Sequence, residues 1–329
     1  MKLKKIKNWI KEDFYYILFI VIVFIICNVK LPYYIMAPGG VINMNDRIRL
    51  ENKYETKGTL NLLYVSEYDA TIASSLLSFV FKDWDLNKID EIQVNNESMK
   101  EIELRNKFML DNSRQNAIMV AYNKASKKVK INGSKSIVIA TTKDNNLKIG
   151  DIILRANGIE IKDIKELKNI ISNSSDNINL DIKRNDKQEQ IVVPINEKNG
   201  IKQIGIVMIT NYDYELDPKI QIDFKNSEGG SSGGLMIALN IYNSLTKEDI
   251  TKGHKIAGTG TIDINGNVGA IDGVKYKIMG AYKNKMELVF VPKENYEEAI
   301  KIINEKKYKI KVVGISNFDE ALEYLNNKL

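Results

Sequence analysis

The chain of 329 residues has a single cysteine, Cys27, and a single histidine, His254. With one residue of each type, thiolate–imidazole catalysis and metal sites built from histidine and cysteine are nearly excluded. Cys27 lies inside an apolar N-terminal run, which makes it a poor nucleophile. His254 lies in the polar stretch 251–255, which is typical of a surface loop. If the protein is a hydrolase, we therefore expect its general base to be a lysine.

The sequence also lacks an excess of one charge and a nucleotide-binding loop. The formal net charge is only +6, and lysines are interleaved with acidic residues along most of the chain. No face is therefore predicted to bind phosphates, and no nucleic-acid partner is expected. The pattern G-x-x-x-x-G-K-[ST] does not occur, so neither ATP nor another cofactor or a metal is expected.

The N-terminus combines a basic segment with an apolar run. Five lysines within residues 1–11 precede the run 14–29, which residues 9–10 and 31–35 can extend. This pattern predicts a transmembrane anchor over 14–35, a cytoplasmic tail over 1–13 and an extracellular remainder. A cleavable signal peptide is the alternative, but its small-residue cleavage pattern is missing. We therefore expect a single-pass protein of the cell membrane, with the lipid bilayer as a partner.

The region after the anchor reads as an α+β fold. Residues 36–128 are expected to form the N-terminal part of the catalytic region, with a strand at 59–65 and helices at 70–81 and 114–127. Residues 200–329 alternate strands and helices, including helices at 235–245 and 274–282, a hairpin over 256–269 and a buried strand at 288–291.

Residues 129–199 read as a compact β-rich module. The pattern L-x-x-G-D-x-I-x-x-x-N-G runs from Leu147 to Gly158. The Asn157–Gly158 pair predicts a hairpin, Asp163 can cap a short helix, and two alternating strands follow. This order resembles a PDZ domain, a fold that binds extended peptides by adding them as a strand. Another small β module is the alternative.

A glycine-rich loop precedes the apolar run 235–245. The segment 229–234 reads Gly-Gly-Ser-Ser-Gly-Gly. Glycine permits positive φ and close approach of another chain. Backbone N–H groups at a helix N-terminus favour an anion, such as the oxyanion of acyl transfer. A glycine-rich turn without chemistry is the alternative.

A single lysine interrupts an apolar helical stripe in the segment 274–281. Val274, Lys277, Ile278 and Ala281 share one helical face, whereas Lys275 points away. Burial disfavours the ammonium form, so a buried lysine can act as a general base. The alternative is a lysine whose amine reaches back to water.

Three motifs together resemble the proteolytic domain of Lon-type serine peptidases, whose pattern is G-P-S-A-G, then T-G, then G-G-L-K-x-K. The matching segments here are 228–234, 259–260 and 271–277. The resemblance implies that Ser232 is the nucleophile, Lys277 the base and Thr259 the residue that orients the lysine. Backbone N–H groups at Gly230 and Ser232 would then form the oxyanion hole. Ser231 replaces the usual proline, so a second serine competes for the nucleophile's role.

The order of anchor, PDZ-like module and Lon-like domain resembles membrane-anchored PDZ–Lon proteases of Gram-positive bacteria. The resemblance implies an ATP-independent Ser–Lys endopeptidase that cleaves extracellular or membrane-proximal peptides and proteins. The PDZ-like module is expected to lie within or before the Lon-type fold. The competing reading is an inert scaffold in which the PDZ-like module tethers partners at the membrane. The sequence leaves the oligomeric state open.

Overall fold

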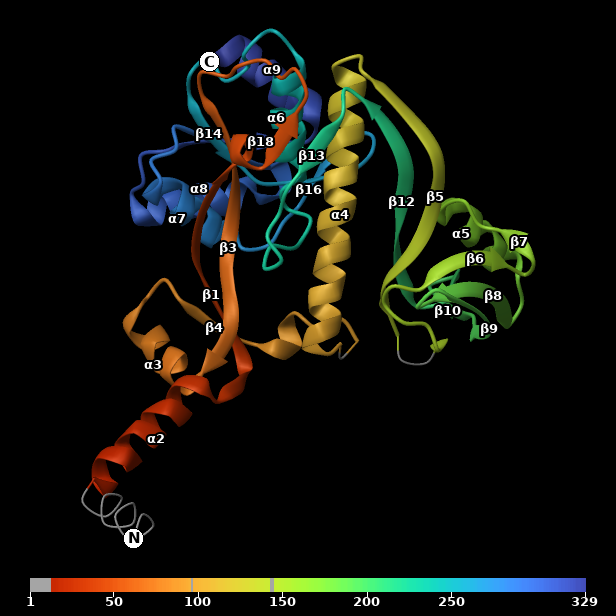
Figure 1. The fold of residues 1–329 in the computed structure, drawn as a ribbon, viewed down its shortest axis with the longest axis horizontal. Coiled ribbons are helices and arrows are strands. Elements are labelled where there is room, and N and C mark those ends of the chain that lie inside the picture. The colour runs from red at the N-terminus through yellow and green to blue at the C-terminus, as the bar shows by residue number, and fades with distance from the viewer. Residues whose placement is uncertain (1–12, 96, 143–144) are drawn as a thin grey trace, which may run out of the picture. The chain divides into compact units, whose positions relative to one another are not determined.

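A computed structural model describes residues 13–95, 97–142 and 145–329 of the chain. Within these ranges the chain divides into two compact units, which are shown in Figure 1. The smaller unit comprises residues up to 39 together with 65–92, and the larger comprises 40–64 and 93–329. The predicted basic tail, apart from Asp13, and the apolar pair 9–10 lie outside the described residues.

In its described part, the smaller unit contains helices α2 and α3 and segments of strands β1, β3 and β4. Helix α2 (Phe14–Asn28) leads into strand β1 (Lys30–Asn43), and helix α3 (Ile72–Val80) follows strand β3 (Thr59–Thr71). Residues 33–36 of β1 pair antiparallel with β4 (Asp85–Lys88). Within the part of the chain that the structure describes, no helix is both long enough and apolar enough to cross a membrane.

The C-terminal end of the predicted anchor is wrong, because the helix stops at Asn28 and not near residue 35. The Asn28 amide donates a hydrogen bond to the Phe24 carbonyl at 2.8 Å. Val29 then adopts an extended conformation. Pro32, whose ring locks φ and removes a backbone donor, disfavours helix just beyond this point. Residues 30–43 are therefore a strand.

The larger unit contains a parallel sheet covered on both faces. Its strands run in the order β18-β17-β14-β3 and are part of a six-stranded sheet that continues through β1 to β4. These four strands pair in parallel with their neighbours. Helices α6 and α9 lie on one face, and α7 and α8 on the other. The bounds are β14 (Lys255–Gly258), β17 (Leu288–Pro292), β18 (Lys311–Ile315), α6 (Gly234–Leu245), α7 (Val274–Lys283), α8 (Tyr296–Lys306) and α9 (Phe318–Lys328).

The alternation of side chains along the buried strands explains this two-sided cover. In β14, Ile256 belongs to the core beneath α6, and the next residue, Ala257, belongs to the core beneath α7. In β17, Phe290 and Val289 divide between the same two cores. A strand that is apolar on both faces is typical of a parallel sheet between helices.

The hairpin predicted over 256–269 is only partly correct. Residues 255–258 form β14, a parallel member of the main sheet. The hairpin itself is β15 (Thr261–Ile262) paired with β16 (Val268–Gly269). Periodicity alone does not distinguish a buried parallel strand from the first arm of a hairpin. A separate short pairing joins β2 (Ile48–Leu50) to β13 (Ile220–Ile222).

The β-rich module follows the long helix α4 (Met99–Lys124). Its sheet has the order β12-β5-β6-β8-β9, with β7 paired to β6. A core of buried residues, among them Ile153, Leu167 and Leu180, lies within the module. The bounds are β5 (Lys128–Thr141), β6 (Ile152–Ala156), β7 (Ile159–Glu160), α5 (Ile164–Asn173), β8 (Asn177–Arg184), β9 (Lys187–Pro194), β10 (Asn196–Lys198), β11 (Ile201–Gln203) and β12 (Ile206–Asp217).

The predicted boundary at 199/200 needs correction, because β12 continues the sheet of the β-rich module. Its residues pair antiparallel with β5 from Ile206↔Thr141 to Asp217↔Lys128. The two long strands β5 and β12 therefore connect the β-rich module to the rest of the larger unit, as Figure 1 shows. The sequence contains no linker signal here, since both connections are strands.

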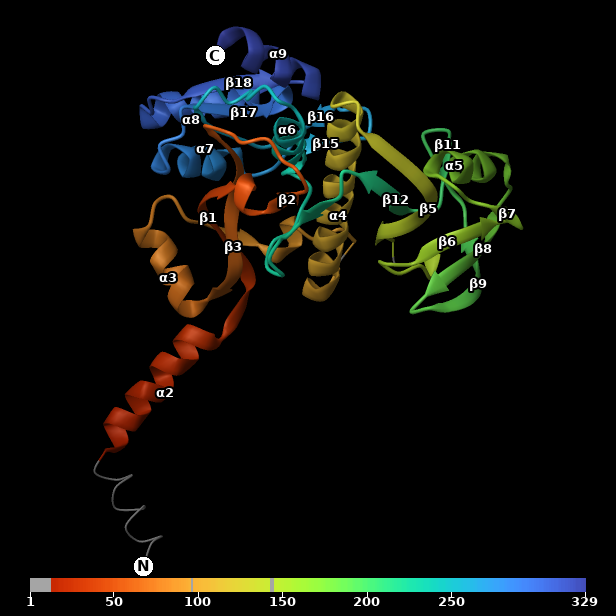
Figure 2. The same cartoon turned by 45° about the horizontal axis from the view of Figure 1, so that its top comes forward.

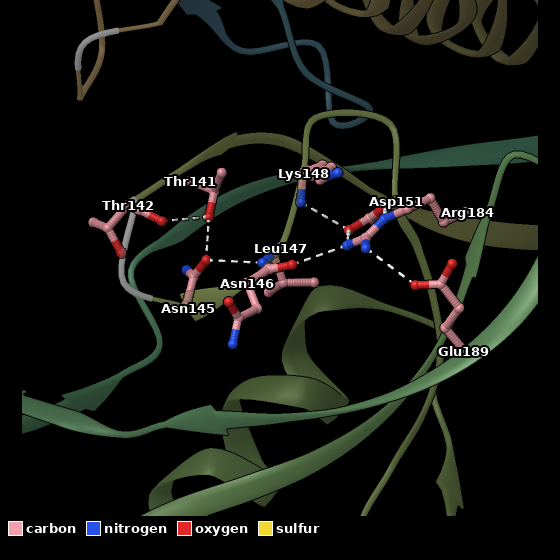
Figure 3. Close-up of polar contacts among 9 residues, drawn as sticks. All are labelled: Thr141, Thr142, Asn145, Asn146, Leu147, Lys148, Asp151, Arg184 and Glu189. Carbon is pink, nitrogen blue, oxygen red and sulfur yellow. Dashed lines mark hydrogen bonds and ion pairs between the residues drawn. The ribbon is translucent and has the colours of Figure 1, made fainter.

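A buried ion pair anchors the β-rich module, and Figure 3 shows its surroundings. The carboxylate of Asp151, only 1% exposed, accepts two hydrogen bonds from Arg184, at 2.8 and 2.7 Å. It also accepts a bond from the Lys148 amide at 2.8 Å. Arg184 donates in addition to the Asn146 carbonyl and to Glu189. The aspartate of the L-x-x-G-D pattern thus fixes the loop before β6 to strand β8.

Candidate active site

The serine loop enters α6 through a hydrogen-bonded turn. The Ser231 carbonyl accepts a bond from the Ser113 hydroxyl of α4 at 2.8 Å. The Ser232 carbonyl accepts two bonds, from the Gly260 amide at 2.7 Å and from the Thr259 hydroxyl at 3.0 Å. Both serines are partly buried. The loop is therefore held from two sides by residues that follow β14 and by α4.

At two positions of the loop, glycine is favoured over other residues, once by the backbone conformation and once by close packing. Gly230 has a φ of +88°, a conformation that L side chains rarely adopt. A Cβ atom at Gly234 would lie 2.6 Å from the Ile262 side chain and 2.7 Å from the Ser113 hydroxyl. The close packing of α6 against its neighbours thus requires glycine at its first residue.

Lys277 lies in the first turn of α7 and is buried, with 4% of its surface exposed. Val274, Ile278 and Ala281 of the predicted stripe all lie in one core cluster. Tyr276 and Met279 are buried as well, so α7 is enclosed on more than the predicted stripe. Lys275 is half-buried, with its ammonium 5.2 Å from the centre of the Tyr276 ring.

The topology brings the starts of α6 and α7 to the same edge of the sheet. Strands β14 and β17 are parallel neighbours, so their carboxyl ends coincide. The serine loop is bonded to Thr259 and Gly260, directly after β14. Ile271, just before α7, exchanges two hydrogen bonds with the Asn295 side chain beyond β17, at 2.9 and 3.0 Å. Ser232, just before α6, and Lys277, in the first turn of α7, therefore belong to one edge of the sheet, and the two helices cover its opposite faces.

The two amides assigned to the oxyanion hole differ in this structure. The Gly230 N–H donates to the Asn106 carbonyl at 2.9 Å, so the prediction for Gly230 is not supported by this geometry. Among the described residues, the Ser232 N–H makes no hydrogen bond. Ser232 lies two residues before α6, where the helix dipole favours a negative charge. The Ser232 amide thus remains suited to an oxyanion.

Thr259 is fully buried and contacts the serine loop. Its hydroxyl donates to the Ser232 carbonyl, and its amide donates to the Phe290 carbonyl of β17. These bonds fix the residue between the sheet and the loop. The role of orienting Lys277, implied by the resemblance, stays a prediction.

The surface assignment of His254 is confirmed. Its ring is 40% exposed, and Nδ1 lies 2.7 Å from a Glu287 carboxylate oxygen. The hydrogen bond with His254 is the largest of the causes that lower the pKa of Glu287. Cys27 lies on α2 in the smaller unit, where its side chain is exposed. His254 and Cys27 thus belong to other parts of the chain than the serine loop.

A cavity of about 490 Å³ adjoins the serine loop. Its lining includes Ser231, the β15–β16 hairpin and α4, and also Ile139 and Ile209 from the long strands β5 and β12. Two carboxylates, Asp263 and Glu294, lie in the lining, and none of its described residues is cationic. This cavity can accept an apolar or basic side chain better than an acidic one.

Sequence reasoning missed the residues that hold the loop from a distance. Glu228, just before the loop, accepts a bond from Arg47 at 2.6 Å and from the Lys225 amide at 2.7 Å. Ser113 and Asn106 come from α4, more than a hundred residues earlier. No periodic pattern links such distant positions, so only the fold identifies them.

Comparisons with known proteins match two parts of the chain. Residues 225–327 match the family model of the Lon protease (S16) C-terminal proteolytic domain, and residues 115–195 match that of the PDZ domain. The Lon protease of Mesomycoplasma hyopneumoniae is 33% identical over 118 residues, which are 32% of this chain and 13% of the relative. The Lon protease of Clostridioides difficile is 35% identical over 135 residues, 38% of this chain and 16% of the relative.

Among solved structures, the PDZ domain of an SdrC-like protein from Listeria monocytogenes is 27% identical. The match covers 25% of this chain and 93% of that chain, with a TM-score of 0.22. The chain thus carries a Lon-type proteolytic domain and a PDZ domain, with Lon proteases as homologues. These matches support a serine peptidase domain of the Lon type, and they cover less than a fifth of the length of the two Lon proteases.

Proposed function

We propose that the protein is a serine endopeptidase in which Ser232 and Lys277 form a catalytic dyad. The observation that carries this proposal is the meeting of the starts of α6 and α7 at one sheet edge. The buried position of Lys277 supports it, because burial favours the neutral amine, which is the form that can accept a proton.

In this mechanism the Ser232 hydroxyl oxygen attacks a peptide carbonyl while the neutral Lys277 amine takes the hydroxyl proton. The carbonyl oxygen becomes an oxyanion, which the Ser232 amide and the N-terminal end of α6 stabilise. Lys277 then gives the proton to the leaving amine. A water molecule, deprotonated by Lys277, finally attacks the acyl-enzyme and releases Ser232. No step requires ATP or a metal.

We assign the cavity beside the serine loop to a side chain of the substrate. Its walls come from both the proteolytic domain and the strands β5 and β12 that carry the PDZ domain. The PDZ domain would bind the same substrate elsewhere along its length and raise its local concentration. Substrates are therefore extended or small peptides, such as segments of exported proteins.

The location that the sequence favours is the cell membrane, with α2 in the lipid and the catalytic unit outside the cell. The support is the apolar sequence of α2 and the basic segment before it. Protease added to cells whose wall has been removed should then digest the larger unit. If the larger unit is not digested while the cell membrane is intact, the orientation is wrong.

The test of the catalytic proposal is covalent labelling. A fluorophosphonate probe should modify Ser232 in the full chain, as identified by mass spectrometry, and a Ser232→Ala variant should stay unlabelled. An inert scaffold would show no labelling of either serine.

A further inference from the structure

Helix α2 is unusual because, within the described part of the chain, all of its residues stay at least partly exposed. Its fifteen residues, FYYILFIVIVFIICN, include no charge, and none of them is buried. Exposed fractions reach 50% for Phe14, 62% for Phe19 and 65% for Phe24. A helix that docks in a protein groove needs an apolar stripe on one side. One that is apolar all round is typical of an apolar solvent, and lipid is the solvent of that kind.

A second apolar surface lies on α3, some fifty residues later in the chain. Its sequence, IASSLLSFV, also lacks any charged residue. Leu76 is 61% exposed, Phe79 81% and Val80 70%. Helix α3 contacts α2, and in Figure 2 it lies beside the C-terminal end of that helix. The two helices are therefore in contact, and both expose apolar side chains.

Aromatic side chains border this surface where α3 ends. The Phe81 and Trp84 rings lie 4.9 Å apart, and Tyr68 meets Trp84 edge-on at 5.6 Å. Lys82 lies between Phe81 and Trp84 in the sequence and is exposed. Tryptophan, tyrosine and lysine next to an apolar surface are typical of the level at which lipid headgroups meet the hydrocarbon.

We propose that α3 is a second membrane contact, whose exposed residues Leu76, Phe79 and Val80 enter the same bilayer as α2. The inference rests on the membrane location proposed above. Lipid is the occupant favoured by the structure because α3 contacts α2, which is apolar on every side and has no buried residue. The two contacts together would hold the smaller unit at the bilayer surface by more than one point.

The single cysteine of the chain makes this inference testable in the full-length protein. In a Cys27→Ser background, Phe79→Cys is labelled with an environment-sensitive nitrobenzoxadiazole dye and reconstituted in vesicles of phosphatidylcholine and phosphatidylglycerol. We expect a blue-shifted emission that falls several-fold when the lipids are replaced by brominated phosphatidylcholine. Val80→Cys should behave in the same way, which guards against an effect of losing Phe79 itself.

Two reference positions separate the possible failures. Glu323→Cys, on the exposed side of α9, should give unshifted and unquenched emission. The native Cys27, labelled in the unchanged chain, reports on α2. If the label at Cys27 is quenched by brominated lipid but those at positions 79 and 80 are not, the α3 contact is wrong and the anchor stands. If none is quenched, the membrane location fails with it.

A second copy of the chain is the remaining occupant that the experiment distinguishes. Contact between copies would shift the emission at position 79 to the blue without quenching by brominated lipid, which would overturn the inference. Labelling of Ser232 by the fluorophosphonate probe, unchanged in every variant, shows that the fold is retained.

Discussion

The PDZ domain and the proteolytic domain each bury an ionisable side chain, and they do so differently. In the PDZ domain the Asp151 carboxylate is matched by a bidentate bond from Arg184 and by a backbone amide. In the proteolytic domain Lys277 lies in the first turn of α7, where both burial and the helix dipole disfavour a cation. The first arrangement stabilises a fold. The second places an amine where burial favours its neutral form, which is the form that the proposed general base requires.

The two domains also have separate cores. The core of the PDZ domain contains only aliphatic buried residues, whereas the core beneath α6 includes the aromatic rings of Tyr122, Phe290 and Phe318. Long strands connect the two domains, but the buried clusters are distinct. Substitutions in one core should therefore leave the other largely intact, and this independence makes the comparison open to experiment.

The largest effect is expected at the dyad. Ser232→Ala or Lys277→Ala should each reduce kcat/KM for a short peptide by on the order of 10⁴-fold, because nucleophile and base act as one unit. The double variant should be no worse than either single one. Circular dichroism and thermal unfolding measure whether the fold persists.

The matched controls are the neighbouring residues of the same types. Ser231→Ala and Lys275→Met should each retain activity within a few-fold of the unchanged protein. An inactive Ser231→Ala beside an active Ser232→Ala would shift the nucleophile by one position. That outcome would agree with the presence of Ser231 in the cavity lining.

The next effect concerns the ion pair of the PDZ domain. Arg184→Met leaves the buried Asp151 carboxylate without its main partner, which should lower the free energy of unfolding of this domain by about 3–5 kcal/mol. Hydrogen exchange of residues 136–194, followed by mass spectrometry, measures the loss. Labelling of Ser232 by the probe should be unchanged, since the proteolytic domain has its own core.

The exposed ion pair on the same strand serves as the control. Lys183 and Asp186 are 2.8 Å apart, with 40% and 93% of their side chains exposed. Lys183→Met should cause no measurable change, because water screens such pairs. Equal destabilisation by Arg184→Met and Lys183→Met would mean that burial does not decide the strength of these pairs.

The sequence predicts the elements that carry the chemistry better than the contacts that hold them. Helices at 235–245 and 274–282 and the buried position of Lys277 follow from apolar periodicity and are confirmed. The 255–258 strand was read as a hairpin arm, because its parallel partners lie far along the chain. The end of α2 was missed because an apolar run continues past Asn28 while the backbone becomes extended. Local sequence patterns therefore predict where the buried helices lie, whereas the strand pairings and the end of α2 depend on the folded structure.

A smaller effect is expected at a carboxylate of the proteolytic domain, Asp249. Burial alone would raise its pKa, but hydrogen bonds from Thr251, the Lys57 amide and Asn243 together lower it. Since the folded-state pKa is below the unfolded value of about 4, this stabilisation is present above pH 4 and lost as the pH falls further. Asp249→Asn should lower the free energy of unfolding at pH 7 by about 1–3 kcal/mol.

Urea denaturation at several pH values measures this difference. The gap between the unchanged protein and Asp249→Asn should be constant from about pH 5 to pH 7 and narrow as the pH falls below about 4, because the unfolded chain then binds the proton more readily than the folded protein does. A gap that widens in acid would show that the hydrogen bonds favour the protonated form.

The smallest effect, about tenfold per pH unit, distinguishes lysine from histidine as the base. Only a neutral amine accepts a proton, so the rate of the chemical step should rise tenfold per unit below the pKa of Lys277 and then level off. Single-turnover rates on a short peptide measure this profile. His254→Gln should leave it unchanged, because that ring is 40% exposed and bonded to Glu287. Lys277→Arg should be inactive at every pH, since a guanidinium stays protonated.

A rate that is flat from about pH 6 to 10, or a profile that disappears in His254→Gln, would exclude lysine as the base. Lys277 would then no longer differ from Asp151 in serving catalysis rather than the stability of its domain.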